Sequence, residues 1–181
     1  MHIRVALRIL GNLLMMFSLT MLPPIIISVI FKEGLANIFL NAFTITFLSG
    51  AVLWAIFKGV KDELRIKDGF LVTFVFYLAL GIFGAIPLIH PDGTDLGIPN
   101  GLFESISGLT TTGATVITNL DDLPKSILFY RQQLQWLGGM GIIVLAVAIL
   151  PMLGIGGMQL YRAETPGPMK DSKLTPRIKQ T

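Results

Sequence analysis

The residues best suited to chemistry form a run of threonine and glycine, TTTGAT, from Thr110 to Thr115. A short apolar segment over 99–109, which we predict to be a helix, leads into this run. At about a dozen residues, it is too short to cross a hydrocarbon core of about 30 Å but long enough to enter it and return. Non-helical backbone at membrane depth is tolerated only where protein buries it or where it lines a water-filled cavity. Since the carbonyls of such a backbone can replace the water around an ion, the pattern is typical of a cation pore.

Two charged residues near this run are candidates for supporting it. Glu104 falls inside the predicted short helix, and an acidic residue at membrane depth is a functional candidate. It could raise the local cation concentration, but we favour a structural role as an acceptor for backbone N–H groups behind the loop. Arg131, with Gln132, Gln133 and Gln135 beyond it, could brace the loop by hydrogen bonds. Alternatively, these residues form an interfacial collar with Trp136.

The composition is that of a membrane protein. Of the 181 residues, 52% are hydrophobic and 14% are charged, whereas soluble domains carry about 25% charged residues. The chain has no cysteine, which excludes disulfides and thiolate chemistry, and no basic face that would indicate nucleic-acid binding. Its two histidines are far apart in the sequence, and it has no phosphate-binding glycine loop with a lysine. We therefore expect neither an enzyme nor a tightly bound cofactor.

Four long apolar segments must position the loop, and they predict an all-α membrane protein. They span residues 9–31, 35–57, 70–89 and 126–162. The first three fit single crossings, and Pro23-Pro24 should kink or end the first helix. The fourth would be about 55 Å long as a straight helix, so it must tilt, bend or project into the cytoplasm. The predicted fold is four transmembrane helices plus one re-entrant pore helix and filter loop.

Basic residues predict the orientation of these helices. With the N-terminus in the cytoplasm, 11 lysines and arginines fall in cytoplasmic segments and 3 in external ones, which places both termini in the cytoplasm. Residues 90–125 then form an external connection that is long for a structureless loop. It has room for the short helix, with Pro99 and Asn100 at the start and Asn100 as the cap.

Three regions follow from these elements. Residues 1–67 hold two helices and a cytoplasmic loop, residues 68–162 hold one helix–pore loop–helix unit, and residues 163–181 form a polar cytoplasmic linker. The linker contains Thr175-Pro176, which is typical of a helix start and suggests the front part of a longer protein. One loop can cover only one side of an ion, so a filter needs about four loops around an axis. Either four copies assemble, or the other loops lie in further sequence.

Two stretches carry a resemblance to a known family: FESISGLTTTGAT at residues 103–115 and RQQLQWLGGMGI at residues 131–142. Together they closely resemble the Trk/Ktr/HKT superfamily of potassium transporters, most closely the membrane subunit of bacterial Trk potassium uptake systems. That subunit has two extra helices and then four helix–pore loop–helix repeats. The resemblance implies that this chain is its N-terminal portion, with the two extra helices followed by the first repeat, and that it takes up potassium across the bacterial inner membrane.

The resemblance also implies a selectivity filter of five consecutive residues: Thr111, Thr112, Gly113, Ala114 and Thr115. The backbone carbonyls of the first three would bind potassium. Gly113 would be the filter glycine, since it can adopt backbone angles that strain other residues and leaves room for an ion. Thr110, Glu104 and Arg131 are the candidate supports for this loop.

The implied partners are the lipid bilayer, potassium as the transported ion, a cytosolic nucleotide-binding regulatory subunit and a second copy in a homodimer. Nucleic acid is not expected. Two alternatives stay open from the sequence. The chain could form a homotetrameric cation channel with two helices per pore, or it could be a non-conducting membrane scaffold whose glycine-rich helices pack against others.

Overall fold

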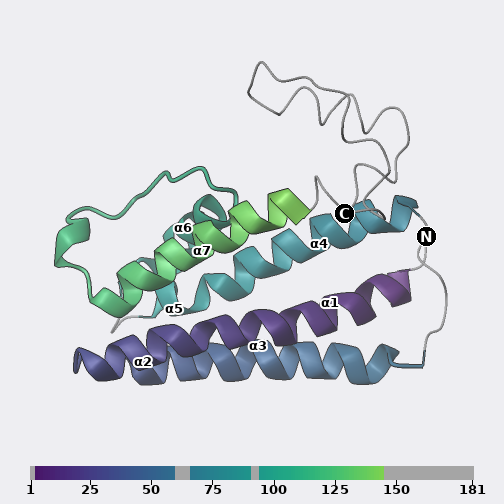
Figure 1. Ribbon diagram of the computed structural model, residues 1–181, viewed down its shortest axis with the longest axis horizontal. Helices are drawn as coiled ribbons and strands as arrows, with labels where there is room; N and C mark the ends of the chain where they lie inside the picture. Colours follow the sequence, from purple (N-terminus) through teal and green to yellow (C-terminus); the bar gives the residue numbers. More distant parts are fainter. Residues whose placement is uncertain (1–2, 60–65, 91–93, 145–181) are drawn as a thin grey trace, which may run out of the picture. The chain divides into compact units, whose positions relative to one another are not determined.

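The computed structural model describes residues 3–59, 66–90 and 94–144, with side chains over 3–59, 73–90 and 94–141. Every regular element in this part of the chain is helical, in agreement with the predicted class (Figure 1). In chain order the elements are α1 (Ile3–Ser18), η1 (Leu19–Met21), α2 (Leu22–Ile30), α3 (Ala36–Phe57), α4 (Ile66–Gly84), α5 (Ile86–Ile89), α6 (Gly97–Leu109), η2 (Leu120–Asp122) and α7 (Lys125–Val144). The predicted continuation of the last helix to 162 and the linker over 163–181 lie outside the described residues.

The first apolar segment folds as a broken helix. α1 ends at Ser18, a single 3-10 turn follows, and α2 begins with prolines in its first turn. Proline is tolerated there because the first N–H groups of a helix have no intrahelical acceptor. The interruption that Pro23-Pro24 predicts is therefore present, slightly earlier than the prolines themselves.

Within the described residues, two stretches are long and apolar enough to cross a membrane, Ile3–Ile30 with 28 residues and Ala36–Phe57 with 22 residues. A shorter apolar helical stretch covers Thr73–Ile89. It was expected to be one helix over 70–89. Instead α4 starts at Ile66 and is interrupted after Gly84, before the proline of α5.

The α1–α3 pair packs closely because glycine faces glycine. A Cβ atom placed on Gly11 would lie 2.7 Å from the carbonyl oxygen of Gly50, and one placed on Gly50 would lie 2.7 Å from the carbonyl oxygen of Gly11. Small residues allow this approach of two backbones. Asn12 of α1 and Asn41 of α3 are both exposed, so they do not lie between these helices.

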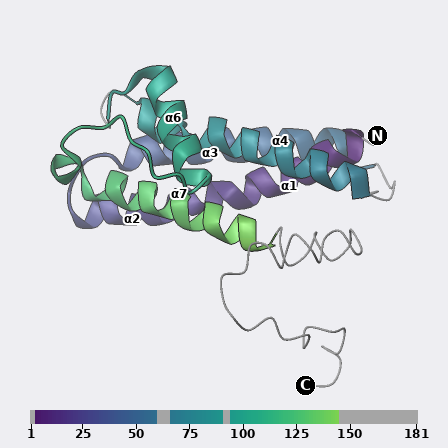
Figure 2. The same cartoon turned by 90° about the horizontal axis from the view of Figure 1, so that it is seen from above.

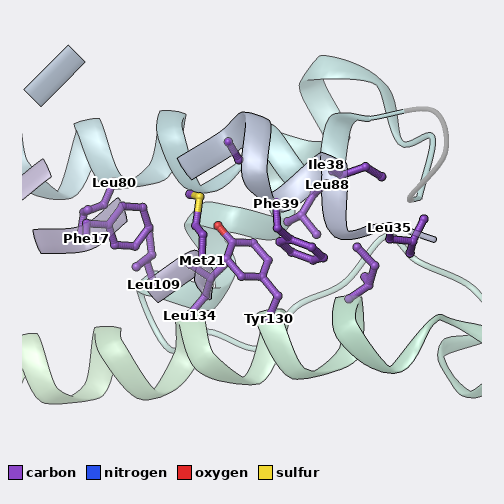
Figure 3. Packing of buried hydrophobic residues seen from close by; sticks show 12 residues of the cluster. Phe17, Met21, Leu35, Ile38, Phe39, Leu80, Leu88, Leu109, Tyr130 and Leu134 are labelled. Atoms are coloured by element: carbon purple, nitrogen blue, oxygen red, sulfur yellow. The ribbon is translucent and has the colours of Figure 1, made fainter. Parts of the chain in front are cut away.

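The core forms where helices from both ends of the sequence meet. Its centre is Tyr130 of α7, whose ring packs edge-on against Phe39 of α3 with centroids 5.5 Å apart (Figure 3). The buried Tyr130 hydroxyl donates a hydrogen bond of 2.8 Å to the carbonyl of Gly84. That carbonyl lies at the interruption between α4 and α5, where Leu88 N–H bonds to Ala85 instead. Tyr130 thus supplies the donor that the interrupted helix lacks.

Candidate ion-binding site

The short helix ends in a hydrogen-bonded cap that begins the threonine and glycine loop. The N–H of Thr111 bonds to the carbonyl of Gly108 at 3.0 Å, and the N–H of Thr112 bonds to the carbonyl of Ser107 at 3.0 Å. These two bonds define a Schellman end, whose central residue takes a left-handed conformation and is usually glycine. Here that residue is Thr111, with φ of +57°. A β-branched residue in this region is strained by about 1–3 kcal/mol.

The helix begins earlier than the sequence indicated. α6 starts at Gly97 rather than at Pro99, and Asn100 lies within the first turn instead of capping it. Gly97 has a φ of +68°, which lets the chain turn into the helix there. Pro99 is accommodated because N–H groups of the first turn need no intrahelical acceptor. The C-terminal bound, Leu109, is the one expected.

Residues 110–117, which we call the Thr/Gly loop, are non-helical after the cap. Gly113 has a φ of +72°, a left-handed conformation of the kind expected for it. The hydroxyl of Ser107 donates a 2.6 Å hydrogen bond to the carbonyl of Ala114. Among the described residues, by contrast, no donor bonds to the carbonyls of Thr111, Thr112 or Gly113, and all three residues are exposed. Three consecutive carbonyls are therefore available to a ligand.

Glu104 holds the far end of the loop. Its side chain is 1% exposed, and its Oε1 accepts hydrogen bonds of 2.6 Å from the Thr115 hydroxyl and 2.6 Å from the Val116 N–H. Its Oε2 accepts from Nε and Nη2 of Arg131 at 3.1 and 2.8 Å. Arg131 Nη2 also donates to the Thr115 hydroxyl at 3.2 Å. This geometry matches the structural interpretation of Glu104, because the carboxylate binds a loop N–H and an arginine.

One face of α7 follows the loop. Arg131 contacts Thr115, the amide nitrogen of Gln135 lies 3.8 Å from the position of a Cβ on Gly113, and a Cβ on Gly138 would overlap the carbonyl oxygen of Leu109. The three α7 residues are spaced by four and three positions, which places them on one side of a helix. In Figure 2 the end of α6 lies over α7, and the chain that follows it runs back towards the start of α7. The Arg131 contacts are those that bracing of the loop by hydrogen bonds requires.

An apolar cavity lies beside the first residue of the loop. The cavity, of about 150 Å³, lies between α4 and α6. It is lined by Phe74, Tyr77, Leu78, Ile106, Leu109 and Thr110. The described residues contain no group of three or more histidine, cysteine or acidic side chains that could hold a metal ion.

The sequence identified the loop and, as supports for it, Glu104 and Arg131, which the structure brings to its far end. The third candidate support, Thr110, is the first residue of the loop itself. The Thr110 hydroxyl lies 2.8 Å from that of Thr112 and donates to the carbonyl of Ile106 at 2.9 Å. The sequence analysis missed Ser107. Its position could have suggested the role, because this serine lies seven residues before Ala114 on a helix that was expected to end next to the loop. The left-handed conformation of Thr111 could not be predicted from the sequence, since threonine is disfavoured at positive φ.

A family model and curated relatives match the sequence of this chain. The family model TrkH, described as a cation transport protein, matches residues 35–181. The Trk system potassium uptake proteins TrkH of Halomonas elongata and of Escherichia coli K12 are 59% and 52% identical over all 181 residues of the chain. The chain spans 38% of the length of each.

A solved structure is also similar, the crystal structure of the potassium transporter TrkH from Vibrio parahaemolyticus. It aligns with a TM-score of 0.79 and 47% sequence identity, over 90% of this chain and 36% of that one. The family match covers well over half of the chain, and the helical fold agrees with that of the solved relative. The chain therefore belongs to the TrkH family of cation transport proteins.

Proposed function

We propose that the protein to which this chain belongs takes up potassium across a bacterial inner membrane, as the membrane subunit of a Trk-type system. The observation that carries the proposal is the loop held from behind, in which the carbonyls of Thr111, Thr112 and Gly113 accept no hydrogen bond from the described residues. Relatives of 52–59% identity are named as potassium uptake proteins, which supports the choice of ion.

The described helices suit a membrane arrangement of four crossings and one re-entrant segment. The α1–α2 segment and α3 would be the two extra helices. The α4–α5 segment, α6 with the Thr/Gly loop, and α7 would form the first helix–pore loop–helix repeat. α6 has 13 residues, about 20 Å at 1.5 Å per residue, so it suits an element that enters the membrane and returns. Both termini would then lie in the cytoplasm.

The ion would enter the loop after losing part of its water. A bare ion in a low-dielectric medium costs tens of kcal/mol, so its hydration shell must be replaced by oxygens. The C-terminal end of α6 carries roughly half an elementary negative charge and leads into the loop, which favours a cation there. Ala114 would serve as scaffold and not as a ligand, because its carbonyl already accepts the Ser107 hydroxyl.

One such loop encloses only one side of the ion. About three more loops are needed to surround it. The chain spans 38% of the length of its relatives, so we place the other loops in the rest of such a protein. The cytosolic nucleotide-binding subunit and the homodimer expected from Trk systems belong to the same proposal.

Replacement of Gly113 tests the proposal. In the full gene product, expressed in cells that lack potassium uptake, we expect Gly113→Ala to reduce the preference for potassium over sodium, because both the φ of +72° and the space for an ion require glycine. Gly97→Ala is a matched control, since Gly97 has a φ of +68°, is exposed, and has nothing within 4 Å of its Cβ position. If Gly113→Ala leaves uptake and ion preference the same as Gly97→Ala does, Gly113 is not part of the filter.

A further inference from the structure

The connection between α2 and α3 holds the first turn of α7. Glu33 lies in this connection, and its Oε1 accepts a 2.5 Å hydrogen bond from the N–H of Lys125. Its Oε2 accepts from both the N–H and the hydroxyl of Ser126, at 3.2 and 2.5 Å. The first N–H groups of a helix have no intrahelical partner, and a negative charge is favourable at that end. One carboxylate thus satisfies two of these groups from 92 residues away in sequence.

The connection is built to present this carboxylate. The N–H of Glu33 bonds to the carbonyl of Ser28 at 3.0 Å, and the hydroxyl of buried Ser28 accepts from the N–H of Leu35 at 3.0 Å. The residues on either side of Glu33, Lys32 and Gly34, both have left-handed backbone conformations. The turn is therefore fixed at both sides of Glu33. In Figures 1 and 2, the α2–α3 connection and the start of α7 lie at the same end of the helices.

A second contact joins the same hairpin to α7 further along. Phe39, in the first turns of α3, packs against Tyr130, five residues after Lys125. Arg131, which bonds to Glu104 and Thr115, is the next residue. From Lys125 to Arg131 a helix rises about 9 Å, so the Glu33 contact and the loop contact belong to one short rigid rod.

We propose that Glu33 is a positioning residue for ion selectivity. By fixing the start of α7, it sets where Arg131, Gln135 and Gly138 lie along the helix axis relative to the Thr/Gly loop. The inference rests on the proposed function, because it concerns the loop's discrimination between ions. It gives the two N-terminal helices, which contribute no oxygen to the loop, a role in its geometry.

The test uses the full gene product reconstituted in lipid vesicles, with initial uptake of potassium and of sodium measured separately. Glu33→Gln removes the charge and one acceptor, and Ser126→Ala removes only the hydroxyl donor. Asp121→Asn removes an equal charge from an exposed residue of the α6–α7 connection and serves as the control for electrostatic attraction of cations. The readout is the potassium-to-sodium ratio at equal protein amount. A loss of folding alone would lower both rates and leave the ratio unchanged.

We expect Glu33→Gln to lower this ratio about fivefold or more, the lower end of coupling between packed elements. Ser126→Ala should lower it by less, the double variant should be no worse than Glu33→Gln, and Asp121→Asn should equal the parent protein. An unchanged ratio in Glu33→Gln and Ser126→Ala, or an equal decrease in Asp121→Asn, would overturn the inference. If Glu33→Gln does not reach the membrane, Ser126→Ala decides, since it keeps the carboxylate and both N–H donors. A parent protein without preference for potassium would instead refute the proposed function.

Discussion

Replacing Glu104 with glutamine should separate the two roles that an acidic residue can have next to an ion path. The change keeps the shape and leaves one oxygen for the Thr115 hydroxyl and the Val116 N–H, but it places an amide opposite the Arg131 guanidinium. Both bonds from Arg131, at 3.1 and 2.8 Å, are then lost. Removing one partner of a buried pair costs about 3–5 kcal/mol. Because the Arg131 side chain is 15% exposed and water can partly solvate it, we expect the lower value, about 3 kcal/mol.

Thermal unfolding in detergent, followed together with potassium and sodium uptake, measures this effect. We expect Glu104→Gln to lower both the unfolding midpoint and the potassium preference. Arg131→Lys keeps the charge but loses the two-pronged contact, so its cost should be smaller, about 1–2 kcal/mol. In the double variant Glu104→Gln/Arg131→Gln the losses should not add, since no unpaired charge remains.

The opposite result is equally specific. If Glu104 acts by concentrating cations, Glu104→Gln would leave the unfolding midpoint unchanged. Its uptake deficit would then be largest at low ionic strength and vanish as salt screens the charge. Additive losses in the double variant would also show that Glu104 and Arg131 do not act as a pair. Either finding would refute the view that this ion pair holds the loop from behind.

Two further predictions concern the packing of α7. Gly138→Ala should displace α7 from the end of α6 and cost about 1–3 kcal/mol or more, because its Cβ would overlap the Leu109 carbonyl. The adjacent Gly139→Ala, whose Cβ has its nearest neighbour at 3.9 Å, should be nearly neutral in the same melting and uptake assays, and equal effects would contradict the packing argument. Tyr130→Phe should lower the unfolding midpoint by an amount corresponding to about 1–3 kcal/mol, since it leaves the buried Gly84 carbonyl without a donor. The aromatic packing is kept, so the ion preference should not change; a stability equal to the parent would mean that the bond does not matter.

Local pattern predicted the elements well and their exact ends less well. The apolar period, the prolines and the threonine run were sufficient for the helix leading to Gly113 and for its C-terminal end. The helix start was misplaced by two residues, because the left-handed Gly97 is a stronger local determinant than the cap chemistry of Asn100. The interruption after Gly84 was missed, since an apolar run through Pro87 reads as one continuous segment.

The contacts that hold the loop were harder to predict because they join distant parts of the sequence. Glu104 and Arg131 could be named as candidates, as charges are rare in apolar segments and must be paired there. Nothing in the local sequence of Glu33 distinguishes it from an ordinary charged residue in a turn, and its partners are 92 and 93 residues away. The role of Glu33 can be inferred only when the tertiary structure shows that the α2–α3 connection contacts the first turn of α7.

The contacts of Glu33, Tyr130 and Arg131 all involve α7. Together they restrict the rotation and the axial position of this helix. Arg131 and Gly138 lie on its loop-facing side, whereas Tyr130, about 100° away around the helix, packs against α3. Glu33 fixes the axial position of the same helix at its first turn. A helix held on two sides and at one end cannot rotate or slide to absorb a change on one of them. The geometry of the carbonyls in the Thr/Gly loop therefore depends on residues of the N-terminal hairpin that never contact the loop.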